Sequence, residues 1–262
     1  MSTSLIGYSG FVGGILLKQT SFDSLYRSTT IDSIQGRSFD LVVCSAAPAQ
    51  KWIANKDPFS DLQKIEGLIS SLKTISCKKF ILISTVDVFR DPRAVYEDTP
   101  VQEEGLHAYG LHRRYLERFV VQQFPDHLIV RLPGLVGPGL RKNIIYDLFN
   151  DNNIEAIDSR ASFQFYPMTN LWFDIQVALE AGLKLIHLTA EPIAVSEVAS
   201  RGFGMVFDNP KSSTPALYDM RSRYGAEYGL SSNYQYSKHD TIQAVRAYSQ
   251  YEERNTQSEG VI

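Results

Sequence analysis

Short apolar runs alternate with stretches of helical periodicity along most of the chain. Residues 41–43 (Leu-Val-Val) and 80–83 (Phe-Ile-Leu-Ile) are continuous apolar runs, typical of strands buried on both faces. Between them, residues 60–75 place apolar side chains at 62, 65, 68, 69, 72 and 75, which is the spacing of one helical face. Strands that alternate with helices predict a parallel sheet covered by helices, so we expect an α/β fold.

The same pattern locates the other elements up to about Pro192. The predicted strands are Ser4–Gly7, Asp23–Arg27, Asp40–Ser45, Phe80–Ser84, His127–Leu132 and Lys184–Leu188. The predicted helices are Phe11–Gln19, Ser60–Ile75, about Tyr109–Gln123 and Leu171–Gly182. Beyond Pro133 a glycine-rich loop breaks the alternation, and after Pro192 the pattern indicates a smaller lobe of helices and loops. We expect the polar end, Glu252 to Ile262, to be frayed.

A glycine-rich turn joins the first predicted strand to the first predicted helix. Gly7 permits a tight turn, Gly10 lets backbone N–H groups approach a diphosphate, and Gly13 lets the helix pack close to the strand. A diphosphate would then lie at the positive end of the helix. The alternative is a turn that merely favours glycine. The predicted dinucleotide contacts here and after the third strand are Gly7, Ser9, Gly10, Phe11, Val12, Gly13, Ala46 and Ala47.

The end of the second predicted strand bears on which dinucleotide is bound. An NAD site usually has an acidic residue there to accept a hydrogen bond from the ribose. This chain has Arg27 and Ser28 instead, which suit a 2′-phosphate. The alternative is that Arg27 is a solvated cation. We expect NADP, with NAD also possible.

Composition excludes several classes of protein. The chain has 262 residues, with 26 Lys and Arg against 29 Asp and Glu, so no basic excess favours nucleic acid. No apolar run approaches the roughly 20 residues that span a bilayer, and we expect no secretory signal. Two cysteines build no disulfide framework, and the five histidines build no metal site. We therefore expect a cytoplasmic protein without metal.

Polar side chains collect where the fourth predicted strand ends. Ser84 and Thr85 close that strand, at the sheet edge where parallel sheets bind ligands. Tyr109 and Arg113 follow at the start of a helix, four residues apart and hence on one helical face.

With these residues, the chain resembles the extended short-chain dehydrogenase/reductases that act on nucleotide sugars. Gly7, Gly10 and Gly13 match the glycine motif of that family. Further similar segments are residues 62–89, 131–139, 162–174 and 185–197. The resemblance is strongest to the dehydratase, epimerase and 4-keto-reductase branches. It implies a Rossmann-type doubly wound sheet from residues 1–133 and about 167–190, with a small substrate lobe from about 134–166 and 191–262.

The resemblance also implies the catalytic residues. The family uses a Tyr-x-x-x-Lys pair with a Ser or Thr, which makes Tyr109 the acid/base and Thr85 its hydroxyl partner. Arg113 stands at the lysine position and would contact both the tyrosine and the cofactor. Because arginine keeps the charge, we expect it to lower the pKa of Tyr109. The alternatives are an aromatic core residue for Tyr109, a surface cation paired with Glu117 for Arg113, and a hydroxyl bonded to its own backbone for Thr85.

Several further residues are candidate substrate contacts. The loop 134–143 faces the expected mouth and could hold a diphosphate, although a charged pair in such a loop is often only solvated. Val86 occupies a position where dehydratases have an acid, although Asp87 follows, so an epimerase or a reductase is favoured over a dehydratase. The predicted substrate contacts are Ser84, Asp87, Arg141, Lys142, Asn143 and Phe165. We expect His112 to face solvent or an interface, and His187 to be a core residue.

The sequence thus predicts an NAD(P)-dependent oxidoreductase or epimerase acting on a nucleotide-linked sugar. Two alternatives stay open: a cofactor-binding sensor that lost its chemistry through Arg113, and a reductase of a small carbonyl. The chain is short for the family, which implies a reduced substrate lobe. The helix from Tyr109 has apolar residues at 111, 115, 116, 119 and 120, a wide face from which we expect a homodimer.

Overall fold

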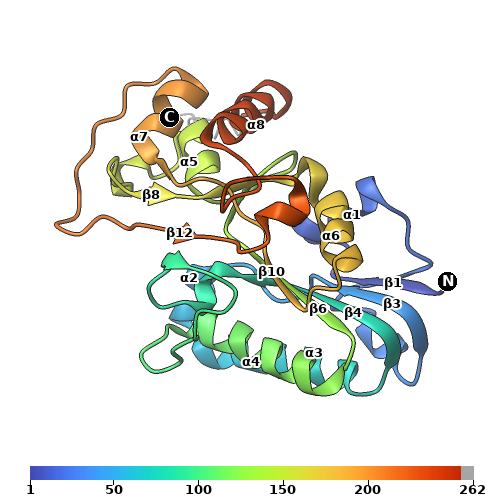
Figure 1. Ribbon diagram of the computed structural model, residues 1–262. Coiled ribbons are helices and arrows are strands. Elements are labelled where there is room, and N and C mark those ends of the chain that lie inside the picture. The colour runs from blue at the N-terminus through green and yellow to red at the C-terminus, as the bar shows by residue number, and fades with distance from the viewer. Residues whose placement is uncertain (255–262) are drawn as a thin grey trace.

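A six-stranded parallel sheet runs through the centre of the computed structural model, which describes residues 1–254 (Figure 1). In spatial order its strands are β10 Leu185–His187, β6 His127–Leu132, β4 Ser76–Thr85, β3 Ser38–Cys44, β1 Thr3–Ile6 and β2 Ser24–Tyr26. Every neighbouring pair is parallel. The chain winds outwards in both directions from β1 and β3, so the switch point of the sheet lies between these two strands.

Adjacent apolar residues in each strand supply both faces of the sheet. In β3, Val42 packs into the core on one side and Val43 into the core on the other, because successive side chains of a strand point to opposite faces. The first face is covered by α3 Pro58–Leu72 and α4 Ala108–Gln123, and the second by α1 Phe11–Gln19 and α6 Leu171–Glu180 (Figure 1). These layers confirm the expected doubly wound α/β fold.

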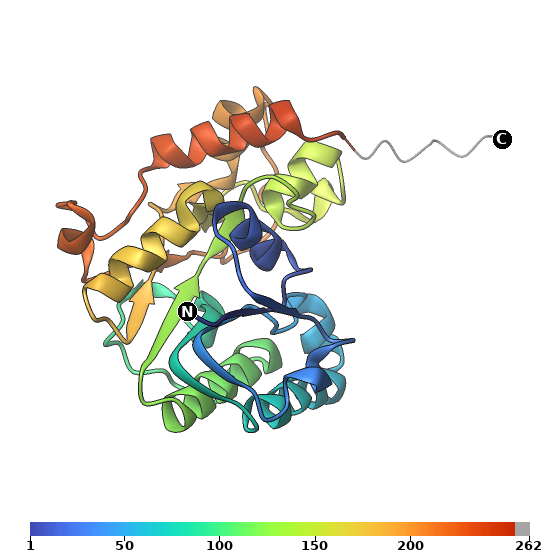
Figure 2. The same cartoon turned by 90° about the vertical axis from the view of Figure 1, so that its right-hand side faces the viewer.

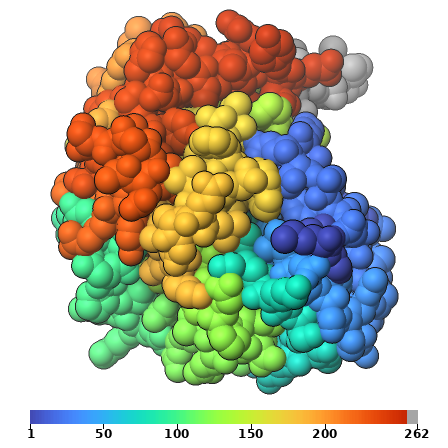
Figure 3. Space-filling model, turned by 45° about the vertical axis from the view of Figure 1, so that its right-hand side comes forward, coloured from blue at the N-terminus to red at the C-terminus, as the bar shows by residue number. Residues whose placement is uncertain are grey.

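A C-terminal group of helices packs above the carboxyl ends of the strands (Figures 1 and 2). Its helices are α5 Ile144–Asn150, the short α7 Val195–Glu197 with the π-helical turn η5 Val198–Gly202, and α8 Lys238–Tyr251. Figure 3 shows this part, in orange and red, covering one end of the molecule. It has an apolar core of its own, to which Phe149, Val198 and Tyr248 contribute.

Small elements connect these parts. The two-stranded pairs are β7 Gly134–Val136 with β9 Phe165–Pro167, β8 Ser162–Phe163 with β11 Ile193–Ala194, and β5 Arg93–Val95 with β12 Asp219–Met220. A short helix, α2 Lys51–Lys56, follows β3. The 3₁₀ turns are η1 Ile31–Ile34, η2 Val86–Val88, η3 Ile154–Ala156, η4 Met168–Asn170 and η6 Gly225–Tyr228.

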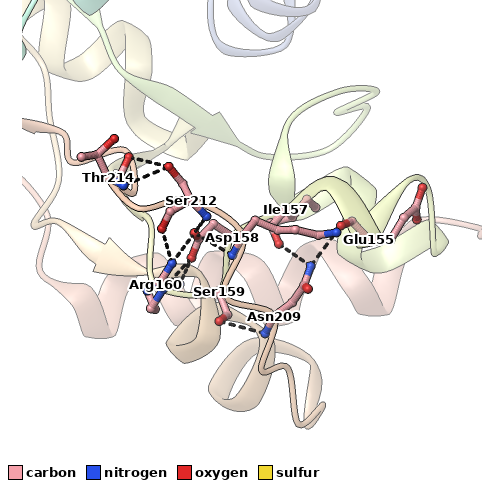
Figure 4. Close-up of polar contacts among 9 residues, drawn as sticks. Glu155, Ile157, Asp158, Ser159, Arg160, Asn209, Ser212 and Thr214 are labelled. Atoms are coloured by element: carbon pink, nitrogen blue, oxygen red, sulfur yellow. Dashed lines mark hydrogen bonds and ion pairs between the residues drawn. The ribbon is translucent and has the colours of Figure 1, made fainter.

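Residues 204–216 form neither helix nor strand, and polar contacts between side chains and backbone groups hold them to residues 155–158 (Figure 4). The Asp158 carboxylate accepts hydrogen bonds from the backbone N–H groups of Lys211 (3.0 Å) and Ser212 (2.7 Å). The Asn209 side-chain amide donates to the carbonyl oxygens of Glu155 (3.1 Å) and Ile157 (2.8 Å). These bonds fix the path by which the chain returns to β12 beside the site.

Most predicted boundaries agree within two residues in both the sheet and the helices, but β4 begins at Ser76, four residues before the expected Phe80. The helix Phe11–Gln19 and the strand His127–Leu132 are confirmed with the same bounds. α3 begins two residues before the expected Ser60, because Asp57 caps it by accepting from the Ser60 N–H at 3.0 Å. The expected frayed end, from Glu252 onwards, lies mostly outside the described residues. No helix within residues 1–254 is both long and apolar enough to cross a bilayer.

Candidate active site

The glycine turn lies at the switch point, at the carboxyl end of β1. Gly7 has a φ of +92°, and a Cβ there would lie 2.7 Å from the backbone of Ser45. A Cβ on Gly13 would lie 2.2 Å from the Gly7 carbonyl oxygen. Both glycines are therefore required by the packing of the chain itself. Ala46 and Ala47 continue the loop after β3 on the other side of the switch point and pack against the core.

Gly10 differs from the other two glycines, because the protein does not need a glycine there. A Cβ at this exposed position would have only the Gly7 oxygen near it, at 3.4 Å. Gly10 is the N-cap of α1 and offers no side-chain cap, and the first turn has no acidic residue. Ser9 is exposed beside it, while Phe11 and Val12 are partly buried. The turn thus presents a positive helix end with space in front of it.

Arg27 and Ser28 are both exposed just beyond β2. The backbone N–H of Arg27 donates to the Thr30 hydroxyl at 3.1 Å, which shapes the turn that follows. This turn leads through η1 directly to β3, so β2 and β3 are joined by a short connection. Neither residue is placed in a closed site within the described chain.

Tyr109 lies in the first turn of α4, beside the carboxyl end of β4. Tyr109 is 9% exposed, and the side chain of Thr85 lies near enough to its phenol to lower the pKa of that phenol. The Thr85 hydroxyl accepts from the backbone N–H of Asp87 at 3.1 Å, so the local backbone bond considered from the sequence is present as well. The two residues that the sequence singled out are therefore brought together.

The pKa of Tyr109 lies above its usual range, not below it as expected. Burial raises this pKa most, and the nearby Asp87 carboxylate raises it further. Arg113 lowers it, as do the side chain of Thr85 and the charge of Lys51, but these effects do not offset burial. The expectation erred because the sequence shows which charge stands nearby and not how much water the phenol loses.

Arg113 is buried, so the alternative of a surface cation paired with Glu117 is wrong. It is 2% exposed, and its guanidinium forms a fork with Asp61, with one bond of 2.9 Å. Its other donors bind the carbonyl oxygens of Pro48 and of Tyr109. The guanidinium carbon lies 4.0 Å from the centre of the Tyr109 ring. Only its Nε–H has no partner within residues 1–254.

His112 is also buried, contrary to the expectation that it faces solvent or an interface. Its Nδ1 lies 2.7 Å from the same Asp61 carboxylate that binds Arg113. Burial opposes the charge of Asp61, but Arg113 and His112 outweigh it and lower the pKa of that carboxyl. A carboxylate on α3 thus holds two side chains of α4.

Ser84 faces away from the site, because a buried carboxylate takes its hydroxyl. It donates to Glu117 at 2.6 Å, and Glu117 also binds Arg131 through a fork of 2.9 and 2.7 Å. Glu117 is fully buried, and although burial opposes its charge, Arg131 outweighs burial and lowers its pKa. The predicted contact between Ser84 and a substrate is therefore not supported by its position.

Asp87 lies beside Tyr109 in a polar cluster that the sequence did not reveal. The ammonium of Lys51, from α2, lies 2.6 Å from Asp87, and the Tyr218 hydroxyl lies 3.1 Å from the same carboxylate oxygen. His107, the N-cap of α4, has its Nε2 at 4.0 Å from that oxygen. Burial and the charge of Lys51 lower the pKa of His107. Chain segments far apart in sequence therefore meet at one carboxylate.

The remaining predicted substrate contacts have mixed placements. Lys142 donates to the carbonyl oxygen of Ala49, and burial and the charge of Arg113 lower the pKa of Lys142 to about 8. Arg141 is exposed beside it. Asn143 instead caps α5 by accepting from the Ile145 N–H at 2.9 Å. Phe165 is 2% exposed in the C-terminal core, so it is not available to a ligand in this arrangement.

Sequence reasoning missed four residues of this region: Lys51, Asp61, His107 and Tyr218. Lys51 lies in a helix too short to give a periodic pattern, and Tyr218 follows a segment with no pattern. Asp61 lies in the first turn of α3, where an acidic residue is common because it interacts favourably with the helix dipole. Its position therefore gave no sign of a further role. His107 alone had a usable signal, because a polar residue directly before a helix is a candidate cap.

The strand order, the glycine turn at the switch point and the polar residues at the carboxyl ends define a Rossmann-type α/β fold. Solved structures share it over nearly the whole chain. A dTDP-4-dehydrorhamnose reductase from Clostridium acetobutylicum aligns with a TM-score of 0.69 and 15% identity, covering 95% of this chain and 98% of that one. A UDP-glucose 4-epimerase from Thermotoga maritima, solved with UDP-glucose, gives 0.70 and 13%, covering 96% and 98%. A dTDP-4-dehydrorhamnose reductase from Bacillus anthracis, solved with NADP, gives 0.70 and 16%, covering 95% and 98%.

These similarities confirm, at the level of the fold, the resemblance noted from the sequence. No protein-family model matches the chain, and no curated protein sequence matches it. The alignments span 98% of these three chains, so the likeness of fold extends over nearly their whole length.

Proposed function

We propose that the protein is an NAD(P)-dependent oxidoreductase or epimerase acting on a nucleotide-linked sugar. The observation that carries this proposal is the Thr85–Tyr109 pair, which lies at the carboxyl end of β4 in the same fold as the reductases and epimerases described above. A phenol beside a hydroxyl at that edge can exchange a proton with a substrate hydroxyl or carbonyl. Any buried phenol needs a polar neighbour, so it is the place of the pair at this sheet edge that supports the proposal.

The turn after β1 supports a dinucleotide as the cofactor. Of the three motif glycines, only Gly10 could carry a side chain without a clash inside the protein. It is the N-cap residue of α1, and no side chain binds the N–H groups at that helix end. A diphosphate in front of α1 would accept from its N–H groups. The unpartnered buried Nε–H of Arg113 is a further donor that a ligand could satisfy. Ala46 and Ala47 would line the opposite side of the switch point.

We propose NADP as the preferred form, with NAD as the alternative. Arg27 and Ser28 are exposed at the end of β2, where the adenosine ribose would lie, and an arginine can bind a 2′-phosphate through a fork. Similar structures hold either form: a reductase from Bacillus anthracis contains NADP, and the Bordetella bronchiseptica enzyme WbmG contains NAD.

In the proposed reaction the nicotinamide would supply or accept a hydride, and the chain would manage the proton. Because burial raises the pKa of Tyr109, the phenol stays protonated near neutral pH and is suited to donate to a carbonyl oxygen. We infer that the Thr85 hydroxyl orients the phenol. A protonated phenol is the form that the reduction of a keto-sugar requires.

One observation favours a second candidate, a cofactor-binding sensor without catalysis. Arg113 stands where the Tyr-x-x-x-Lys pattern has a lysine, and its guanidinium forms an ion pair with Asp61. An arginine held in this way cannot give up its proton, and its charge is neutralised by the carboxylate. The two candidates differ in turnover, not in cofactor binding.

Turnover by Tyr109→Phe separates the two candidates. We would follow NADPH oxidation with a panel of 4-keto nucleotide sugars, and measure NADPH affinity by calorimetry. For an enzyme we expect a loss of about 10²–10⁴-fold in rate with unchanged affinity. Tyr115→Phe is the matched control, because Tyr115 lies on the same helix and is 42% exposed. A wild type that binds NADPH but turns over none of the panel would favour the sensor.

The lobe boundaries, the cytoplasmic location and the homodimer remain proposals. We propose that residues 1–133 with about 167–190 bind the dinucleotide and that the rest binds substrate. The apolar face expected to form a dimer is largely used within the chain, because Leu116, Phe119 and Val120 are buried there. Tyr115 and Val121 remain exposed, and light scattering at micromolar concentration would test a dimer through them.

A further inference from the structure

Lys51 connects three segments of the chain at the mouth of the site. Its Nζ donates to Asp87 Oδ1 at 2.6 Å and to the Tyr218 hydroxyl at 3.2 Å. It comes from α2, whereas Asp87 lies in η2 and Tyr218 directly precedes β12. Figure 1 shows the orange segment that leads into β12 running above α2. The Lys51 side chain is 39% exposed, so the ammonium lies at the edge of the site and not in the core.

Arg113 cannot serve the hydroxyl end of Tyr109 in the same way. Its guanidinium lies against the face of the ring, and its terminal nitrogens are bound by Asp61 and by backbone carbonyl oxygens. Tyr109 therefore has a cation against its ring, and further charges that act on its phenol come from other elements. Asp87 and Lys51 both act electrostatically on that phenol, with opposite sign.

We propose that Lys51 is a positioning residue of this site, whose ammonium turns the Asp87 carboxylate towards Tyr218 and neutralises it beside Tyr109. This inference rests on the proposed function for its catalytic meaning, but not for its physical test. Without the ammonium, a carboxylate only 16% exposed would face the phenol uncompensated. Ionisation of Tyr109 would then become harder, and proton exchange with a substrate slower.

The other charged and titratable groups around Lys51 do not replace it. His107 accepts from the Gly110 N–H through Nδ1, so a neutral His107 carries its proton on Nε2, facing Asp87. Its lowered pKa keeps it neutral near pH 7. Tyr218 donates to Asp87 and brings no positive charge. The titratable groups of the cluster that act on one another are Lys51, Asp87, His107, Tyr109, Arg113 and Tyr218.

The phenol titration of Tyr109 tests the proposal without a substrate. We would replace tyrosine by 3-fluorotyrosine, which makes the phenols more acidic, and assign the Tyr109 signal in fluorine NMR by its loss in Tyr109→Phe. In Lys51→Gln we expect the pKa of Tyr109 to rise, since a nearby positive charge is lost. Lys51→Arg keeps the charge and should restore most of the shift. Lys56→Gln, an exposed lysine on the same helix, should change nothing.

A double variant guards against a merely structural effect. Lys51→Gln with Asp87→Asn removes both charges, so the Tyr109 titration should return towards that of the wild type. An unchanged titration in Lys51→Gln, or a shift that neither Lys51→Arg nor the double variant reverses, would overturn the proposal. If the enzyme assay succeeds, Lys51→Gln should lower kcat about tenfold with little change in the KM for NADPH, and Lys51→Arg should recover it. If no nucleotide sugar turns over, the proposed function fails while the titration still decides the role of Lys51.

Discussion

Arg113 and Tyr109 are stacked: the guanidinium carbon lies 4.0 Å from the centre of the ring, four residues away on the same helix. A guanidinium over an aromatic face is an attractive arrangement, and it fixes the orientation of both side chains. Asp61 on α3 determines this geometry, because it binds the terminal nitrogens of the guanidinium. The flat face of the guanidinium then packs against the Tyr109 ring. Arg113 therefore holds the Tyr109 ring by contact with its face and not by a bond to its hydroxyl.

The Arg113–Asp61 pair should be essential for stability. Arg113→Met leaves a buried carboxylate with only His112 as a partner, and we expect the free energy of unfolding to fall by about 3–5 kcal/mol. Asp61→Leu with Arg113→Met removes both charges and should recover much of the loss. Urea unfolding measures both. Arg118→Met is the control, because Arg118 is 54% exposed on the same helix and its pair with Glu103 should contribute less than about 1 kcal/mol. An equal cost for Arg113→Met and Arg118→Met would contradict the prediction.

Gly10 and Gly13 should respond differently to the same substitution. Gly10→Val should leave the thermal unfolding midpoint nearly unchanged and abolish NADPH binding, because the space in front of α1 is filled. Gly13→Val should prevent folding, since its Cβ would lie 2.2 Å from the Gly7 oxygen. Gly14→Ala is the control, because a Cβ there meets nothing closer than 3.9 Å. Calorimetry with NADPH measures binding, and unchanged affinity in Gly10→Val would remove the argument for this turn.

Arg27 should determine the choice between the two dinucleotides. Arg27→Ala removes a charged donor for the 2′-phosphate, so we expect NADPH affinity to fall about tenfold or more while NADH affinity stays the same. Calorimetry with both cofactors gives the ratio. Arg37→Ala provides a comparison, because Arg37 is engaged by the Tyr26 hydroxyl at 2.5 Å. A wild type that prefers NADH would refute this role of Arg27.

His187 should make stability depend on pH. Burial, with the charge of Arg131, lowers the pKa of His187 to about 3, whereas a histidine in an unfolded chain titrates near 6.5. The unfolded state therefore binds more protons between these values, and the free energy of unfolding falls as the pH drops through this window, by at most about 5 kcal/mol. A proton on Nε2 would face Arg131, which lies 3.4 Å away.

Comparing His187→Gln with the wild type isolates this contribution. Urea unfolding at a series of pH values should give a flatter pH dependence for His187→Gln, whose amide can still donate to the Arg221 carbonyl that binds the histidine at 2.9 Å. His239→Gln, at an exposed position, should follow the wild type. Parallel curves for the wild type and His187→Gln would show that the histidine titrates normally.

The sheet could be predicted from the sequence because its signal is local. Each buried strand has adjacent apolar residues, such as Val42 and Val43, and the two faces of the sheet require both. The glycine turn could be predicted for the same reason, because the strand, the turn and the helix follow one another directly in the sequence. Thr85 and Tyr109 were placed together by resemblance, and the structure does bring them into contact.

The charged partners could not be predicted, because they come from distant segments. Arg113 has Glu117 one helical turn away, the pairing that local spacing suggests, yet it binds Asp61 on another helix. Glu117 binds Arg131 and Ser84 instead, and all three are buried. Lys51 and Tyr218 meet across 167 positions of sequence. Such pairs follow from how the helices pack on the sheet, which a single sequence does not specify.

The way in which residues 208–214 are held has a consequence for how this stretch can change during evolution. Asp158 binds backbone N–H groups of the stretch, and Asn209, within the stretch, binds the backbone carbonyl groups of Glu155 and Ile157 (Figure 4). Backbone groups remain the same whichever side chains the other positions carry. Substitutions at Lys211 and Ser213 should accumulate freely, apart from proline at 211, which would remove a donor. Asp158 and Asn209 have no such freedom. Among related sequences the path of this stretch should therefore persist long after its residues other than Asn209 have diverged.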